Sequence, residues 1–404
     1  MNIGIIGGGA SGMCAALAAA QNPNANVHIF ERQARVGRKL LATGNGRCNL
    51  TNVHADISHY HGEVPEFCVS ALTAFSAEKT IEWFRSLGLY TVTESTGRVY
   101  PYSDQANSVV DVLRFALSKP NITLHTGCEV RHIRKTNDGF TVSAGEESHC
   151  FDKLIIACGG LAGSKLGSSM SGYQLLKQMG HRITLLRPAL VQIKSGWNGC
   201  VSLKGVRANC RAAILHDGAV FRESTGEIQF TEYGISGPVV FEISRDACRA
   251  KGNWICRLDF LPEIPDDTLL EELSRRRDRE LPTEELLTGI LHNRLGRVLT
   301  SAAGIRGQRS VMSLTDEELN DICRIVKSLE IPLTELMGMD NAQVTAGGAV
   351  TEEFDSQTME SRLVQGLYAC GEVLDIDGDC GGYNLQWAWS SGMVAGCSAG
   401  EVNL

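Results

Sequence analysis

The sequence predicts an α/β fold in which both ends of the chain build one parallel sheet and the middle supplies inserted domains. The first observation is a short apolar strand at the N-terminus that runs into glycines and then into a helix. The second is that two more apolar strands end in glycines much later, near residues 160 and 371. The third is a change of pattern between them, β-like over residues 188–261 and helical over residues 262–340.

The N-terminal segment has the order strand, glycine turn, helix, strand and acid. Asn2 to Ile6 is a β-branched apolar run, an alanine-rich helical stretch follows the glycines, and a second strand ends at Glu31. In a dinucleotide-binding βαβ unit, Gly7 would make the tight turn, Gly9 would let the backbone approach a pyrophosphate, and Gly12 would permit close helix packing. The segment therefore predicts a Rossmann-type nucleotide site.

Two features of this unit define the expected ligand. The first turn of the helix, with Ala10 and Ser11, directs unpaired amides at an anion, and the helix dipole adds about 0.3 to 2 kcal/mol. Glu31 accepts hydrogen bonds from a free ribose 2′-hydroxyl and repels a 2′-phosphate. The ligand predicted at this site is therefore FAD or NAD rather than NADP.

A basic loop rich in glycine and amides follows Glu31. It begins at Arg32, continues through Gly37, Arg38 and Lys39, and extends over residues 43–52. A simple dehydrogenase would go on with another α/β unit, whereas this loop suits an extended dinucleotide whose ring lies far from its adenine. The loop therefore favours FAD.

Two distant strands complete the predicted nucleotide domain. Residues 152–160 are an apolar strand that runs into glycines, and residues 366–372 are another that closes on a carboxylate. Residues 381–384 then open a helix rich in small residues, whose N-terminal amides can stabilise negative charge on a ring carbonyl. The pattern predicts one domain assembled from residues 1–187 and 341–404.

Four stretches of the chain carry a resemblance to a known family. They are Gly37-Arg38-Lys39 with Gly46-Arg47-Cys48-Asn49, Gly97-Arg98-Val99-Tyr100-Pro101, Thr231-Glu232-Tyr233-Gly234-Ile235-Ser236-Gly237-Pro238, and Gly371-Glu372 through Gly381-Gly382-Tyr383-Asn384-Leu385-Gln386. With them the chain resembles, nearly end to end, the BaiN/YhiN-like family of FAD-dependent oxidoreductases among the two-dinucleotide-binding-domain flavoproteins. Residues 169–172 depart from this pattern, because Ser-Met-Ser-Gly stands where a Thr-Gly-Asp-Gly-like stretch is expected.

The resemblance implies FAD as the cofactor and gives roles to individual residues. Glu31 would hold the adenosine ribose and Glu372 the ribityl or pyrophosphate region, with Asn384 and Leu385 near the isoalloxazine. By placement alone, the catalytic candidates near the ring are Arg47, Cys48, Asn49, Tyr100 and Asn384. The full set of expected FAD contacts is Gly7, Gly9, Ala10, Ser11, Gly12, Glu31, Arg32, Gly37, Arg38, Lys39, Gly46, Arg47, Cys48, Asn49, Val130, Cys158, Gly159, Gly160, Gly371, Glu372, Asn384 and Leu385.

An antiparallel ribbon is expected before the apolar strand at residues 152–160. Residues 122–125, 128–134 and 140–143 alternate as strands, and Asn137-Asp138-Gly139 marks a hairpin turn. Val130 lies in the second of these strands. Ribbons of this kind cover the sheet in FAD-binding folds, so we expect the same arrangement in this chain.

The middle of the chain is expected to hold two inserted domains. Residues 188–261 predict a β-barrel-like domain, because short apolar runs alternate with glycine turns. Residues 262–340 predict a small helical domain, with capping residues, acids and apolar stripes beginning at Thr268, Thr283 and Thr315. Two insertions between the halves of a cofactor domain predict a substrate cleft against the flavin.

Composition and charge narrow the remaining possibilities. The 404 residues carry 38 lysines and arginines against 46 aspartates and glutamates, a net charge of -8, and such a chain does not attract nucleic acid through its overall field. No apolar run reaches the roughly 18 residues that a membrane helix needs, and the N-terminus lacks the basic residues of an export signal. We therefore expect a soluble, cytoplasmic protein with no membrane and no nucleic-acid partner.

Several suggestive clusters are assigned no function. The 14 cysteines include no CxxC pair, which excludes zinc ribbons and thioredoxin-like sites. The histidines of residues 54–61 lack metal-ligand spacing, and the aspartates of residues 375–379 begin like a calcium loop but lack its glycine and final glutamate. We expect a polar loop at each place and no metal site.

These observations favour a FAD-dependent oxidoreductase. We expect a small organic molecule to exchange a hydride with flavin N5, with NADH or NADPH as a transient electron donor, because no second glycine motif follows a strand. The alternatives are a FAD-dependent oxidase of a small amine or keto metabolite that uses oxygen, a tRNA-modifying or RNA-binding flavoprotein, and a flavin-bearing redox sensor. The substrate, the catalytic acid and the oligomeric state stay open.

Overall fold

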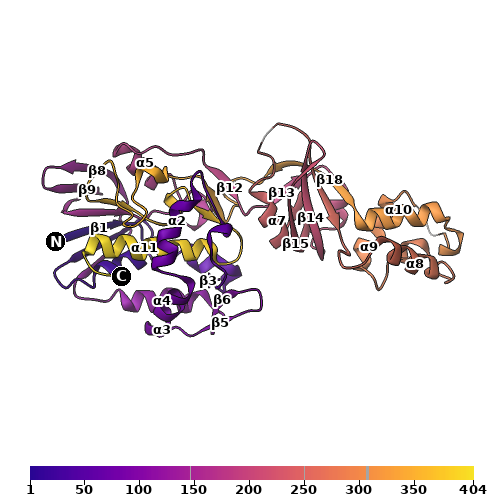
Figure 1. Cartoon of the computed structure of the whole chain (residues 1–404), viewed down its shortest axis with the longest axis horizontal. Coiled ribbons are helices and arrows are strands. Elements are labelled where there is room, and N and C mark those ends of the chain that lie inside the picture. The colour runs from indigo at the N-terminus through magenta and orange to yellow at the C-terminus, as the bar shows by residue number, and fades with distance from the viewer. Residues whose placement is uncertain (146, 250, 306–308) are drawn as a thin grey trace. The chain divides into compact units, whose positions relative to one another are not determined.

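The computed structural model describes residues 1–145, 147–249, 251–305 and 309–404. The chain divides into two compact units (Figure 1): unit 1 consists of Met1–Pro188 and Gln343–Leu404, and unit 2 consists of Ala189–Ala342. Both ends of the chain therefore belong to unit 1. Within the described ranges, no helix has the length and apolar character that crossing a membrane requires.

Unit 1 is built around a parallel sheet with the strand order β20-β11-β1-β2-β7. Its strands are β1 (Asn2–Ile6), β2 (Asn26–Glu31), β7 (Ile122–Thr126), β11 (Lys153–Ile156) and β20 (Leu367–Ala369). The apolar side chains of β1 and β11 are buried on both faces, as in the centre of a covered parallel sheet. The predicted α/β sheet assembled from distant segments is confirmed. Because all five strands run the same way, their carboxyl ends lie along one edge.

Helix α1 (Ala10–Ala19) packs against the last helix, α11 (Tyr383–Gly400), through small residues. A Cβ placed on Gly392 would come 2.5 Å from the backbone oxygen of Ser11, and one on Gly396 would come 2.3 Å from that of Ala15. Residues four apart share a helix face, so these glycines let the two backbones approach closely. The contact joins the C-terminal segment to the N-terminal βαβ unit (Figure 1).

Short elements make up the rest of unit 1. The helices are α2 (Cys68–Ala74), α3 (Ala77–Ser86), α4 (Ala106–Ala116) and α5 (Ser171–Gln178). Three small sheets join β3 (Thr51–Asn52), β6 (Arg98–Pro101) and β5 (Thr91–Thr93); β4 (Tyr60–His61) and β21 (Asp377–Gly378); and β12 (Arg187–Ala189) and β19 (Val344–Ala346). The pair of β4 and β21 brings together segments more than 300 residues apart in the chain.

The antiparallel ribbon differs in one strand from its predicted form. It consists of β8 (Val130–Thr136), β9 (Gly139–Ala144) and β10 (Glu147–Phe151), in the order β10-β9-β8. The run at residues 122–125, predicted as a ribbon strand, is instead β7, the edge strand of the parallel sheet beside β2. That prediction was wrong because a half-exposed edge strand shows the same short alternation of polar and apolar residues.

Unit 2 contains a closed barrel with the strand order β13-β16-β15-β14-β17-β18. The strands are β13 (Ile193–Ser195), β14 (Arg207–His216), β15 (Ala219–Thr231), β16 (Gly234–Ser236), β17 (Trp254–Asp259) and β18 (Leu329–Leu336). The sequence pattern assigned the last of these to a helical segment. In β18, however, Leu329, Ile331 and Leu333 alternate as buried residues with exposed ones, which is the period of a strand.

The helices of unit 2 are α6 (Gly199–Ser202), α7 (Pro238–Ser244), α8 (Asp266–Arg276), α9 (Asn293–Ala302) and α10 (Asp316–Lys327). The predicted helix start at Thr315 is confirmed, because its hydroxyl accepts from the amide of Glu318 at 3.2 Å and the Glu318 carboxylate accepts from the Thr315 amide at 2.9 Å. The pattern at Thr283 gives only one 3-10 turn, Thr283–Glu285.

One hydrophobic core serves both the barrel and the helices of unit 2. Leu258 and Leu329 of the barrel belong to the same buried cluster as Leu269, Leu299 and Leu319 of the helices. The expected boundary between residues 261 and 262 therefore does not separate two cores. The chain leaves the barrel after β17, forms the helices, and returns to the barrel in β18.

Candidate active site

The turn between β1 and α1 requires glycine at two positions. Gly7 has a φ of 112°, and a Cβ there would come 2.3 Å from the backbone oxygen of Ala157. A Cβ on Gly12 would come 1.9 Å from the backbone oxygen of Gly7. A side chain at either position would collide with backbone, so only glycine lets strand and helix approach this closely. This geometry fits the roles predicted for both residues.

The space in front of Gly9 is open. A Cβ on Gly9 would meet no described atom within 4 Å, and the same holds for Gly159 after β11. Gly9 is also the N-cap of α1, Ala10 and Ser11 begin the first turn, and in the described part of the chain no side chain caps it. Backbone amides and the helix dipole therefore face a space that an anion can fill. The space and its donors fit a pyrophosphate.

Glu31 holds the glycine turn in place from the end of β2. Its carboxylate accepts hydrogen bonds from the backbone amides of Gly8 at 2.8 Å and Gln33 at 2.7 Å. A carboxylate has about four acceptor sites, so two such bonds leave capacity for a ribose hydroxyl. The neighbouring Arg32 donates to the backbone oxygen of Gly167 at 2.7 Å and lies 3.8 Å from Glu129. Arg32 therefore ties the loop before α5 to this end of the sheet.

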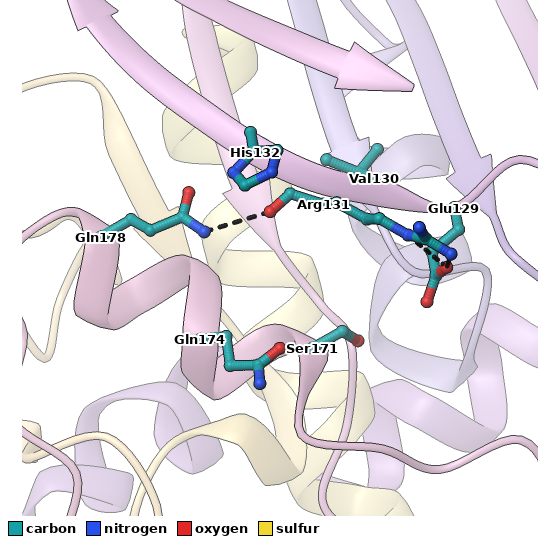
Figure 2. Close-up of a pocket in the computed structure, with 7 residues that line it drawn as sticks. All are labelled: Glu129, Val130, Arg131, His132, Ser171, Gln174 and Gln178. Atoms are coloured by element: carbon teal, nitrogen blue, oxygen red, sulfur yellow. Dashed lines mark hydrogen bonds and ion pairs between the residues drawn. The ribbon is translucent and has the colours of Figure 1, made fainter. Parts of the chain in front are cut away.

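A pocket of about 470 Å³ opens beside Glu129. Figure 2 shows β8 and α5 facing each other across it. Its lining residues are Glu129, Val130, Arg131, His132, Ser171, Gln174 and Gln178. Gln178 donates to the backbone oxygen of Arg131 at 3.0 Å and so joins α5 to β8. Arg32, the residue that follows Glu31 in the sequence, contacts Glu129 at the rim of this pocket. The pocket therefore lies at the end of the sheet where we expect the adenosine. Val130, one of the predicted FAD contacts, lines this pocket.

Glu372 lies at the same edge of the sheet and pairs with Lys39. Lys39 Nζ lies 2.8 Å from Glu372 Oε2, and the amide of Thr345 donates to Glu372 Oε1 at 2.9 Å. A Cβ on Gly160 would come 2.5 Å from Glu372 Oε1, so glycine lets the carboxylate lie against the backbone. Tyr173 is fully buried near this carboxylate, and burial, then the charge of Glu372, raises its pKa.

Four other residues predicted to bind FAD in this region also make contacts within the chain. The amide of Gly37 donates to the backbone oxygen of Gly8 at 2.9 Å, and Arg38 donates to the side chain of Gln33 at 2.6 Å. Burial raises the pKa of the Cys158 thiol to about 12. Gly371 has a φ of 77°, and a Cβ there would come 2.5 Å from the hydroxyl oxygen of Ser11. These residues shape the turn and bring α1 against the C-terminal segment.

Arg47 and Tyr100 contact each other. Arg47 pairs with Glu94 at 3.0 Å and with Asp104, and its guanidinium lies 4.0 Å from the centre of the Tyr100 ring. The hydrogen bond to Asp104, followed by that to Glu94, raises the pKa of Arg47. Arg47 thus fixes the loop that turns at Gly46, where φ is 86°. The structure gives both Arg47 and Tyr100 a positioning role in this loop.

Cys48 and Asn49 differ sharply in their surroundings. Cys48 is fully buried, and this burial raises the pKa of its thiol to about 12. A protonated buried thiol does not act as a nucleophile at neutral pH. The side-chain oxygen of Asn49 is buried without a described partner, and it lies 2.9 Å from where a Cβ on Gly382 would be. Asn49 therefore faces the start of α11.

Asn384 uses both ends of its side-chain amide on the loop before α11. Its oxygen accepts from the amide of Gly378 at 2.8 Å, and its nitrogen donates to the backbone oxygens of Gly378 at 2.7 Å and Asp379 at 3.2 Å. With these partners Asn384 holds the loop before α11. Leu385 is half-buried and packs against the core of unit 1.

Sequence reasoning missed the polar group around the start of α11. A Cβ on Gly381 would come 3.3 Å from Cε2 of Tyr383 and 3.4 Å from Nε of Arg98. In the described ranges no carboxylate pairs with Arg98, which is half-buried in β6. His59 contacts both Asp379 and Tyr383, and it comes from a segment that the sequence assigns to a polar loop. The sequence contained one signal for this group: Arg98 and Tyr383 belong to the stretches that carry the family resemblance.

Replacing Glu31 with alanine is expected to weaken FAD binding by about 1.5 to 3 kcal/mol, or roughly 10- to 150-fold in Kd. The loss has two sources, the bond to the ribose and the support of the Gly8 amide. Fluorescence titration of the FAD-free protein with FAD measures it. Glu31→Gln is the matched control, because it keeps an acceptor oxygen and the size of the side chain, and it should lose less. An unchanged Kd in Glu31→Ala would contradict the assignment.

The parallel sheet, the glycine turn and the open space beside Gly9 define a FAD-dependent oxidoreductase of the Rossmann type. A family model described as the HI0933-like protein Rossmann domain matches residues 1–398, and the chain belongs to this family. The match confirms the resemblance drawn from the sequence.

The sequence matches to individual relatives cover nearly the whole chain. The chain is 43% identical over 405 residues to the 3-dehydro-bile acid delta(4,6)-reductase of Clostridium scindens, covering 99% of both chains. It is 34% identical over 394 residues to the ribosomal RNA dihydrouridine synthase of Escherichia coli, covering 96% of this chain and 95% of the relative. Among solved structures, it is similar to 3-ketosteroid delta1-dehydrogenase from Sterolibacterium denitrificans, with a TM-score of 0.49, 12% identity and 99% of both chains covered.

Proposed function

We propose that the protein reduces a carbon–carbon double bond conjugated to a carbonyl group, with electrons from NADH or NADPH. Bound FAD supplies the hydride from N5 of its ring. The residues at the carboxyl edge of the sheet fit this cofactor, from the pocket beside Glu129 to the pair of Lys39 and Glu372. The observation that carries the proposal is the position of Arg98 at the start of α11.

Arg98 offers a cation for the carbonyl oxygen of the substrate. Its Nε lies 3.4 Å from the Cβ position of Gly381, in the turn where the reactive ring is expected. When a hydride reaches the far carbon of the conjugated double bond, negative charge gathers on the carbonyl oxygen, and a guanidinium bonded to that oxygen lowers the barrier. The carbonyl of a conjugated double bond makes use of this charge, whereas the amine substrate of an oxidase does not.

The relatives support the same chemistry. One is named for reducing a 3-dehydro-bile acid at delta(4,6), and another for making dihydrouridine in ribosomal RNA. Both names describe the addition of two hydrogen atoms to a carbon–carbon double bond, and in both molecules that bond is conjugated to a carbonyl. A steroid or another small unsaturated ketone is the favoured substrate class, because the first relative is the more similar and the chain has a net charge of -8.

The nicotinamide needs no domain of its own in this proposal. In the described ranges, unit 1 has one glycine turn of the βαβ type, at Gly7 to Gly12, and FAD is expected there. NADH or NADPH would therefore visit the ring, transfer its hydride and leave. The same ring face is then free for the unsaturated substrate.

Anaerobic absorbance spectra of the FAD-loaded protein test the proposal. We expect NADH or NADPH to bleach the oxidised flavin and a 3-oxo-4,6-diene steroid to restore it. The saturated 3-oxo steroid is the matched control, since it lacks the double bond and should leave the flavin bleached. A flavin that neither nicotinamide bleaches, or that the saturated control restores equally well, would contradict the proposal. Recovery with air alone, and no response to the diene, would indicate an oxidase.

Uridine in RNA is the second substrate with this chemistry, and a parallel sample tests it. A ribosomal RNA fragment replaces the steroid, and mass spectrometry detects uridines that have gained two hydrogen atoms. If the RNA restores the flavin and the steroid does not, the substrate is RNA, and its retention should weaken steeply with added salt.

A further inference from the structure

Four polar residues form a connected cluster at the start of α11. Asp379 Oδ2 lies 3.1 Å from Nδ1 of His59, and its Oδ1 lies 2.7 Å from Nε2 of His61. The other ring nitrogen of His59, Nε2, lies 3.3 Å from the hydroxyl of Tyr383. The rings of His59 and Tyr383 stack with their centres 4.1 Å apart. Asp379, His59 and Tyr383 are therefore linked in one hydrogen-bonded series.

The backbone holds this cluster in a fixed geometry. The amide of Asp379 donates to the backbone oxygen of His59 at 2.9 Å, and this contact continues the pairing of β4 with β21 by one residue. Asn384 donates to the backbone oxygen of Asp379 at 3.2 Å. The carboxylate and the imidazole are thus positioned by different segments of the chain, which pair only in the folded protein.

The phenol end of the cluster borders the expected reaction site. A Cβ on Gly381 would come within 3.3 Å of Cε2 of Tyr383 and 3.4 Å of Nε of Arg98. The phenol ring and the guanidinium that would bind the carbonyl oxygen therefore border the same position beside Gly381. In the proposed reduction, the added proton goes to the carbon next to the carbonyl, so the donor has to lie on the side of the substrate that Arg98 binds.

The neighbouring Tyr60 provides a structural comparison. Tyr60 is buried, its hydroxyl donates to the backbone oxygen of Tyr383 at 3.0 Å, and burial raises its pKa well above the usual range. Its proton is committed to the backbone. The hydroxyl of Tyr383 instead meets a histidine that is held by a carboxylate, and histidine is the side chain whose charge changes near neutral pH.

We propose that Tyr383 donates the proton for the reduction and that His59 and Asp379 re-supply it as a relay. This inference rests on the function proposed above. The O–H bond of Tyr383 breaks as a C–H bond forms next to the carbonyl, while the hydride, with two electrons from NADH or NADPH, forms the C–H bond at the far carbon. His59 then returns a proton from Nε2 to the Tyr383 oxygen. Asp379 stabilises the charged imidazole, which solvent protonates again.

Single-turnover kinetics test the role of Tyr383. The FAD-loaded protein is first reduced with the nicotinamide and then mixed with the diene steroid. We expect Tyr383→Phe to slow re-oxidation by about 100-fold or more, because a general acid is lost. Reduction of the flavin by the nicotinamide should stay within about twofold, because this half-reaction needs no proton from the tyrosine. Tyr90→Phe, which changes an exposed tyrosine of unit 1, is the control and should leave both rates unchanged. A Tyr383→Phe variant that re-oxidises at the native rate would overturn the proposal.

Chemical rescue tests His59 as a positioning residue that acts through Tyr383. The side chain of His59 is 32% exposed, so a small molecule can reach the space left by His59→Ala. We expect this variant to re-oxidise at least tenfold more slowly, and added imidazole to restore part of the rate. Tyr383→Phe should not respond to imidazole. His61→Ala, which removes the hydrogen bond between His61 and Asp379, is the control that should not respond to imidazole either. A slow His59→Ala variant that imidazole leaves unchanged would count against the relay.

A spectroscopic measurement separates the relay from the proposed function. In the FAD-loaded protein, ¹⁵N NMR of the histidine rings should show the Nε2 resonance of His59 shifted in Tyr383→Phe and the Nδ1 resonance shifted in Asp379→Asn. Unchanged resonances would contradict the relay, whatever the turnover. If the native protein accepts no electrons from a nicotinamide or gives none to the diene, the proposed function fails. If both half-reactions occur and Tyr383→Phe matches the native protein, the relay alone fails.

Discussion

Substituting alanine for Gly12 is expected to unfold the start of unit 1 and abolish FAD binding. A Cβ at this position would come 1.9 Å from the backbone oxygen of Gly7, and a fixed backbone atom cannot move aside as a side chain can. Overpacking of this kind costs about 3 kcal/mol, which corresponds to a fall in Tm of roughly 6 to 12 °C for a unit of this size. Thermal unfolding of the FAD-free variant and the flavin content after purification measure the two effects.

Gly9→Ala is the matched control for this substitution. It adds the same methyl group three residues earlier, where a Cβ would meet no described atom within 4 Å. We expect its Tm to match that of the native protein, while its affinity for FAD falls because the methyl group enters the space meant for the pyrophosphate. Equal stability of the two variants would show that Gly12 is not the point of close approach between β1 and α1.

The Arg98→Leu variant is expected to show the largest kinetic defect. Removing one donor that stabilises developing charge costs about 100- to 1,000-fold in kcat, so re-oxidation by the unsaturated substrate should slow by this factor. Leucine keeps the apolar part of the side chain, which limits the structural change. Stopped-flow measurement of both half-reactions separates this effect from any loss in flavin reduction by the nicotinamide.

Two further variants define what Arg98 contributes. Arg98→Lys keeps the charge but not the planar guanidinium, and should recover part of the rate. Arg114→Leu removes a positive charge from the exposed face of α4, where Arg114 pairs with Asp111 at 2.9 Å, and should leave the rate unchanged. If Arg98→Leu re-oxidises as fast as Arg114→Leu, Arg98 does not bind the carbonyl oxygen.

The glycine turn could be predicted from the sequence because the residues that form it are close together in the chain. Gly7 and Gly12 lie within one strand–turn–helix segment, so their spacing alone implies the close approach that the structure contains. The parallel sheet could be predicted for a similar reason, because each strand carries its own apolar run. Only β7 was assigned to the wrong sheet, since a short strand does not show which partner it will take.

The polar cluster at α11 could not be predicted because its parts meet only after folding. His59 and Asp379 are 320 residues apart and come together through the pairing of β4 with β21. For the same reason β18 was assigned to the helical segment, although it closes the barrel. The hydrogen bonds of Asn384 could not be predicted either, because a sequence does not show that both ends of its amide bind the preceding loop.

The packing of α11 against α1 also has a consequence for folding during synthesis, because α1 is made first and its partner helix much later. The partner of the N-terminal helix is residues 383–400, and the edge strand β20 ends at Ala369. Unit 2 is one continuous stretch, Ala189–Ala342, and all of it emerges before those residues are made. Unit 2 can therefore fold during synthesis. The first half of unit 1 lacks its edge strand and its partner helix until residues 367–400 have been synthesised.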